Sequence, residues 1–161
     1  MKAIPPASAP DDAAQVLRQF RSVFKAIRTH FRQVEKEAGL GGAQVWALSL
    51  ILSTPGIGVN DIAAGMDIHQ STASNLVKAL LKKDMITVSK SPGDKRVVEL
   101  RLTAEGRKIF KKVQGPYEGV LPGALARLDA ATLARLSTDL HKLTQELQVD
   151  DSAAGTPLAS L

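Results

Sequence analysis

The stretch that most constrains the fold is residues 86–102, where a strand-like pattern occurs twice in a chain that otherwise shows helical spacing. Apolar residues occupy every second position over residues 86–88 and again over residues 98–102. A period of two places alternate side chains on the buried face of a strand. Pro92-Gly93 lies between the two runs and suits the two central positions of a β-turn. The segment therefore predicts a β-hairpin with residues 94–96 close to its tip.

Two short helices joined by a tight turn are expected immediately before the hairpin. Residues 59–66 suit a helix with Asp61 near its positive N-terminus. Asp67 is a residue type that tolerates the left-handed backbone conformation of such a turn. A second helix is expected from Gln70, with a buried stripe formed by Ala73, Leu76, Val77 and Leu80. Together these segments predict a helix-turn-helix followed by a wing, and an ordinary pair of surface helices is the alternative.

The opposite face of the second helix is polar and carries no acidic residue. Such side chains can hydrogen-bond to base edges and phosphates in a major groove, while the apolar stripe fixes the orientation of the helix. The contacts with DNA expected from this helix are Gln70, Ser71, Thr72, Ser74, Asn75 and Lys78.

A second set of DNA contacts is expected on the hairpin, comprising Lys90, Asp94, Lys95 and Arg96. Arg96 is placed to enter an adjoining minor groove, and Asp94 is expected to hold its guanidinium by a charge-assisted bond. Residues 78–112 contain eleven basic and four acidic residues, net +7, whereas the whole chain carries only +5. This concentration of positive charge favours an anionic partner, and a solvated basic face is the alternative.

The text "DIAAGMDIHQSTASNLVKALLKKDMITVSKSPGDKRVVELRLTAEG" resembles the MarR family of winged-helix bacterial transcriptional regulators. The spacing of Asp94, Arg96 and the helix start from Leu102-Thr103 to Gly106 is similar to the wing signature of that family. The resemblance implies that long N- and C-terminal helices form a dimerisation region. Gly115-Pro116 and Pro122-Gly123 depart from the family pattern, and a kink or break is expected there.

The resemblance and the periodicity together predict a mainly α (α+β) fold in one domain. Within the domain, 11–148, residues 41–102 are assigned to DNA binding, and residues 11–38 and 103–148 to dimerisation helices. Residues 1–10 and 149–161 lack periodicity and are predicted to be disordered tails. Leucines at spacings of three and four form a stripe over residues 133–147. This stripe needs a partner, which is either a second copy of the chain or the first helix.

The resemblance also implies a small anionic aromatic effector bound between the helical region and the winged domain. Arg28, His30 and Trp46 are the residues suggested for that site, and packing and surface charge are the alternative roles for each.

Other kinds of site are not indicated. The chain contains no cysteine, its three histidines are scattered, and no catalytic arrangement of side chains emerges. We therefore expect no cofactor, no metal site and no enzymatic activity. No membrane span or signal sequence is recognised, which favours a cytoplasmic protein.

The function expected from the sequence is that of a homodimeric, sequence-specific transcriptional regulator. The resemblance favours a repressor that a small aromatic acid releases from a near-palindromic operator. The alternatives are an architectural DNA-binding protein with little sequence preference, and a winged-helix module devoted to protein contacts or catalysis.

Overall fold

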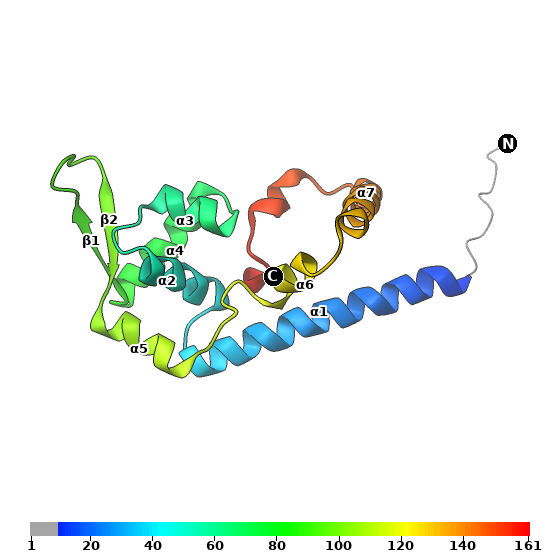
Figure 1. The fold of residues 1–161 in the computed structure, drawn as a ribbon, viewed down its shortest axis with the longest axis horizontal. Coiled ribbons are helices and arrows are strands. Elements are labelled where there is room, and N and C mark those ends of the chain that lie inside the picture. Colours follow the sequence, from blue (N-terminus) through cyan, green and yellow to red (C-terminus); the bar gives the residue numbers. More distant parts are fainter. Residues whose placement is uncertain (1–9) are drawn as a thin grey trace.

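The computed structural model describes residues 10–161 and is mainly helical, with one small β-sheet (Figure 1). Residues 1–9, most of the predicted N-terminal tail, lie outside the described residues. The α-helices are α1 (Pro10–Ala38), α2 (Gly42–Ser53), α3 (Val59–Met66), α4 (Gln70–Lys82), α5 (Ala104–Lys112), α6 (Val120–Ala126) and α7 (Ala130–Glu146). The strands are β1 (Ile86–Lys90) and β2 (Val98–Leu102), and two short 3₁₀ helices follow α7, η1 (Asp151–Gly155) and η2 (Leu158–Ser160).

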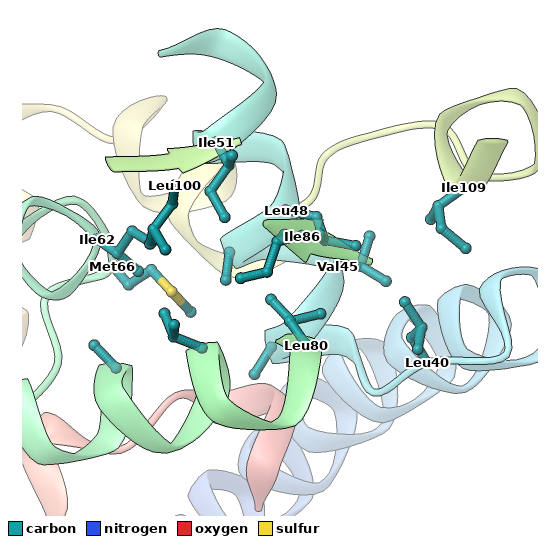
Figure 2. Packing of buried hydrophobic residues seen from close by; sticks show 14 of the residues in the cluster. Leu40, Val45, Leu48, Ile51, Ile62, Met66, Leu80, Ile86, Leu100 and Ile109 are labelled. Atoms are coloured by element: carbon teal, nitrogen blue, oxygen red, sulfur yellow. The ribbon is translucent and has the colours of Figure 1, made fainter. Parts of the chain in front are cut away.

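The hydrophobic core holds α2, α3, α4 and the hairpin together in one body (Figure 2). Ile62 of α3, Leu80 of α4 and Leu100 of β2 are all fully buried, and they meet Leu48 and Ile51 of α2. Burying one such side chain contributes about 1.5–3 kcal/mol. The predicted inward face of α4 is confirmed, with Ala73, Val77 and Leu80 buried and Leu76 half-buried. This packing fixes how α4 presents its other face.

The turn between α3 and α4 has the predicted geometry. Asp67 ends α3 in the left-handed conformation, with φ of 52°. The amide of the next residue, Ile68, donates to the carbonyl of Ala63 at 3.0 Å. Asp61, at the start of α3, accepts a hydrogen bond from the amide of Gly58.

The hairpin is antiparallel, and its register pairs Ile86 with Leu102 and Lys90 with Val98. The prediction that Pro92-Gly93 occupies the centre of the turn is wrong. The carbonyl of Asp94 accepts from the amide of Val97 at 3.0 Å, so the hydrogen-bonded turn has Lys95 and Arg96 at its centre. Pro92-Gly93 instead forms a bend within a longer loop, whose base is closed by the amide of Ser91 donating to Val97.

Only the C-terminal half of α1 packs against the rest of the chain. Ile27, Phe31 and Val34 are buried, whereas Val16 and Phe24 are 49% and 57% exposed. The apolar stripe of α1 therefore continues past the part of the molecule that covers it.

The chain breaks after the winged region, as expected. α5 ends at Lys112, and α6 and α7 follow Gly115-Pro116 as separate helices. α7 has no buried residue, and its leucine stripe from Leu133 to Leu147 is exposed. The alternative in which the first helix covers this stripe within the chain is not what the structure shows.

The segment after α7 is ordered in the structure, contrary to the prediction of a disordered tail over 149–161. It forms η1 and η2, and both Gly155 and Pro157 are buried. The reason is contact with residues far away in the sequence: Gly155 accepts a hydrogen bond from the amide of His69, and Ala159 lies against Gly42. Among the helices of residues 10–161, none is long and apolar enough to cross a membrane.

Candidate nucleic-acid interface

The outer face of α4 is the first part of the candidate interface. Gln70, Ser71, Asn75 and Lys78 are exposed there, while Thr72 and Ser74 are half-buried. The opposite face is anchored by Ala73, Val77 and Leu80, all buried in the core. Because the core fixes α4, the exposed polar groups share one side of a rigid helix.

The start of α4 is suited to an anionic partner. Its first turn contains no acidic residue, and its N-cap, His69, makes no side-chain capping hydrogen bond. The first amides of a helix lack intrahelical acceptors and carry partial positive charge, so they favour phosphate groups. His69 was not among the residues expected at the interface, although its place directly before Gln70 is a signal that could have suggested it.

The hairpin tip is the second part of the candidate interface. Lys90, Asp94, Lys95 and Arg96 are all exposed. The Oδ1 atom of Asp94 accepts a hydrogen bond from the backbone amide of Arg96 at 2.9 Å. No ion pair joins Asp94 to the Arg96 guanidinium within residues 10–161. The expected bond between the two side chains is thus replaced by one that shapes the turn, and Arg96 is left exposed.

Among residues 10–161, some basic side chains near α4 and the hairpin are paired with another side chain, and others are not. Arg101 pairs with Glu99 at 3.4 Å, and the Lys83 ammonium donates to the side chain of Gln44 at 3.1 Å. In α5, the hydrogen bond from Lys108 and its charge lower the pKa of Glu105. In the described part of the chain no such partner is found for Lys78, Lys90, Lys95 or Arg96, so these groups are available to phosphates.

The three residues suggested for an effector site are not brought together. Arg28 lines a cavity of about 400 Å³ beside α1, with Arg32 and the apolar side chains Ile27 and Phe31. His30 lies at a different cavity of about 360 Å³, with its Nε2 atom 2.9 Å from the carbonyl oxygen of Pro116. Trp46 lines neither cavity and packs against the core from α2.

The cavity at Arg28 contains residues that the sequence reasoning missed. Arg32 lies one helical turn after Arg28, a spacing that could have suggested a shared face. Glu35 of α1 also lines the cavity. Leu158, Ala159 and Leu161 line it from the other end of the chain, for which the sequence carries no local signal. Residues 10–161 contain no cluster of histidine and carboxylate side chains that could hold a metal ion.

Comparisons with known proteins bear on this geometry. The family model described as MarR family matches residues 43–98, which span α2, the helix-turn-helix and most of the hairpin. The chain is 23% identical over 131 residues to the HTH-type transcriptional repressor MdtR of Bacillus subtilis (strain 168), covering 81% of this chain and 84% of that protein.

Solved structures show the same fold. A MepR-like protein complexed with pseudoligands matches with a TM-score of 0.56 at 16% identity, over 83% of this chain and 94% of that one. Sco3205, a MarR family transcriptional regulator from Streptomyces coelicolor solved in complex with DNA, matches with a TM-score of 0.55 at 20% identity, over 93% and 96% of the two chains. With the helix-turn-helix and wing in place, residues 43–98 match the MarR family, and the chain shares the winged-helix fold of these solved structures.

Proposed function

We propose that the protein is a homodimeric, sequence-specific DNA-binding repressor that a small anionic aromatic effector releases from a near-palindromic operator. The observation that carries this proposal is the exposure of two DNA-compatible surfaces, the acid-free face of α4 and the basic hairpin tip, on one rigid body. The name of MdtR as a repressor and the DNA complex of Sco3205 support it. Because chromosomal DNA is the proposed partner, we place the protein in the cytoplasm.

In this proposal the two surfaces have different tasks. Gln70, Ser71 and Asn75 read base edges in the major groove, and Lys78 contacts phosphate. Arg96 enters the flanking minor groove, where a narrow groove enhances the negative potential. Contacts with phosphates supply affinity that falls as salt rises, and contacts with bases supply specificity.

The homodimer is proposed because two apolar faces lack a partner within the described chain. One is the leucine stripe of α7 and the other is the first half of α1, which includes Val16 and Phe24. Exposed apolar faces of this extent mark interaction sites. A two-fold dimer would place two copies of α4 roughly 34 Å apart, one helical turn of DNA.

The effector is proposed to bind in the cavity at Arg28. Its volume of about 400 Å³ is within the range for small-molecule sites. Arg28 and Arg32 offer guanidinium groups for a carboxylate, and Phe24, Ile27 and Phe31 offer an apolar wall for a ring. An effector that prefers a dimer with the wrong spacing of α4 would weaken DNA binding by linkage, typically by roughly 5- to 150-fold.

Selection of bound fragments from random DNA, followed by competition with mixed-sequence DNA, tests the proposal. We expect a near-palindromic site that mixed DNA displaces only at large excess. Equal affinity for both would instead indicate an architectural protein, and salt-independent or absent binding would indicate a module for protein contacts or catalysis. Titration of aromatic acids against the selected complex tests the effector, with Arg28→Gln as the matched variant that should respond least.

A further inference from the structure

Residues 150–161, here called the C-terminal segment, run back from α7 to the winged-helix body (Figure 1). The segment makes contacts at two places. Its first half reaches the start of α4, and its second half reaches α1 and α2. Neither the match of residues 43–98 to the MarR family nor the proposed mode of DNA binding gives the segment a role.

The first contact engages both the backbone and the ring of His69. The backbone amide of His69 donates to the carbonyl of Gly155 at 3.2 Å. The Nε2 atom of the His69 ring lies 3.2 Å from the carbonyl oxygen of Ser152. The ring also lies directly on Gly155, which is buried, so that a Cβ atom added at this glycine would overlap ring atoms. A side chain at residue 155 would therefore force the His69 ring or the segment to shift from this position.

The second contact holds the other end of the segment. Pro157 is buried, and a Cβ atom on Gly42 would lie 3.1 Å from Ala159. Leu158 and Leu161 line the cavity beside α1. The segment is thus attached at both ends, to His69 at one end and to α1 and α2 at the other.

The position of the first contact matters because His69 is the N-cap of α4 and directly precedes Gln70 and Ser71. In the docked segment Asp150 and Asp151 directly precede Ser152, whose carbonyl oxygen lies 3.2 Å from the Nε2 atom of His69. Hydrogen bonds from the Ser152 side chain and amide lower the pKa of Asp150 and so favour its ionised form. Carboxylates near this helix start oppose the approach of DNA phosphates.

We propose that the C-terminal segment is an intramolecular cover on the start of α4 that competes with DNA. The docked segment is hydrogen-bonded to His69 and carries the negative charges of Asp150 and Asp151. DNA can bind at the start of α4 only after the segment has dissociated from it. Docking and DNA binding are then mutually exclusive states of one equilibrium, so weakening the first must strengthen the second. This inference rests on the proposed DNA-binding function.

The test uses the full-length protein with Gly155→Ala, which adds the Cβ atom that overlaps the His69 ring. Gly41→Ala is the matched control, because a Cβ atom there meets nothing within 4 Å. Amide hydrogen exchange of residues 150–161 and of His69 reports docking without reference to DNA. Titration against the selected operator and against mixed DNA reports binding.

We expect exchange in the C-terminal segment to be slow in the parent and to rise with Gly155→Ala or with added operator. Gly155→Ala should bind both DNAs roughly fivefold tighter, the low end of the range for coupled sites, and Gly41→Ala should bind as the parent does. The effect depends on the ring of His69. In a His69→Ala background, where the Cβ atom has room, adding Gly155→Ala should change affinity little.

Two results would overturn the proposal. One is fast exchange of the C-terminal segment in the parent, which would mean that it does not dock. The other is release of the segment by Gly155→Ala with DNA affinity unchanged or reduced, which would mean that docking does not oppose binding. A protected segment in a protein that binds no DNA in any variant would instead contradict the proposed function, and the competition would fall with it.

Discussion

At the scale of single residues, the hairpin tip shows how a carboxylate can act on a neighbour without pairing with its charge. Asp94 holds the backbone amide of Arg96 at 2.9 Å, within a turn closed by Asp94 and Val97. Asp and Asn commonly bond the backbone two residues ahead in this way. The geometry makes Asp94 a determinant of turn shape, and it leaves the Arg96 guanidinium available to DNA.

Arg96→Ala should weaken binding to the preferred operator by about 1–3 kcal/mol, as expected for a specific contact with DNA. Because Arg96 is exposed, thermal unfolding should change by less than about 0.5 kcal/mol. Titrations against the operator and against a version with its wing-facing A·T pairs changed to G·C measure the effect. Lys78→Ala is the control, since loss of a phosphate contact should weaken binding to all sequences and lower the salt slope by about one. Unchanged affinity of Arg96→Ala would show that the hairpin is structural only.

Asp94→Asn and Asp94→Ala separate the backbone role of Asp94 from a charge-pairing role. Asparagine keeps the oxygen that accepts from the Arg96 amide, so Asp94→Asn should retain operator affinity. Alanine removes that hydrogen bond, typically worth about 1 kcal/mol, and should weaken binding by a similar or smaller amount by loosening the turn. Equal loss of affinity in both variants would favour the pairing of Asp94 with the guanidinium.

At the scale of elements, the sequence predicts a helix or strand correctly where the spacing of apolar residues determines which face is buried. The period-two runs of the hairpin and the apolar face of α4 are predictable because burial on one side repeats at a fixed spacing. The turn centre was misplaced because Asp94, rather than Pro92-Gly93, supplies the hydrogen bonds that close it. The C-terminal segment was misassigned because its contact with His69 joins residues 83 positions apart, for which no local spacing exists.

For the candidate site, the sequence predicts the exposed face of α4 but not the cavity at Arg28. The exposed face of α4 follows from its buried face, so residues such as Gln70 and Asn75 could be named from helical spacing alone. The cavity at Arg28 could not, because part of its wall comes from Leu158 and Leu161 in the C-terminal segment. Side chains that line a cavity from distant segments leave no periodic trace.

The hairpin and α5 are closely packed where they meet, and Gly106→Ala tests this packing. Thr103 caps α5 by accepting from the Gly106 amide at 3.0 Å, and a Cβ atom on Gly106 would overlap the carbonyl of Met85. Backbone atoms cannot move aside as a flexible side chain can, so the variant should lose about 1–3 kcal/mol of stability. For a chain of this size that corresponds to a fall in Tm of roughly 2–4 °C per kcal/mol, measurable by calorimetry. Gly41→Ala, with open space around it, should unfold close to the parent, and equal Tm values for all three proteins would contradict this packing.

At the scale of the whole molecule, the first half of α1 extends away from the winged-helix body and α7 lies apart from it (Figure 1), both with apolar faces uncovered. The body itself is complete, because Leu48, Leu80 and Leu100 are fully buried within one chain. The proposed dimer therefore concerns how two finished winged-helix bodies are held at a fixed separation. Disrupting it should change DNA affinity while each body stays folded.

Leu140→Asp tests whether dimerisation can be lost while each winged-helix body stays folded. Leu140 lies within the exposed leucine stripe of α7, where a charge should prevent burial against a second copy. Thr138→Asp is the matched control, because it adds the same charge to the same helix on the face away from the leucines. Sedimentation at micromolar concentration should show a dimer for the parent and Thr138→Asp and a monomer for Leu140→Asp, with helical content nearly unchanged by circular dichroism. Since the second half-site is bound as an intramolecular step in a dimer, the monomer should bind the palindrome on the order of 10²-fold more weakly or worse, and a single half-site about as well as before. A monomer that bound the palindrome with full affinity would show that the two half-sites are read independently, and that the exposed faces of α1 and α7 serve another purpose.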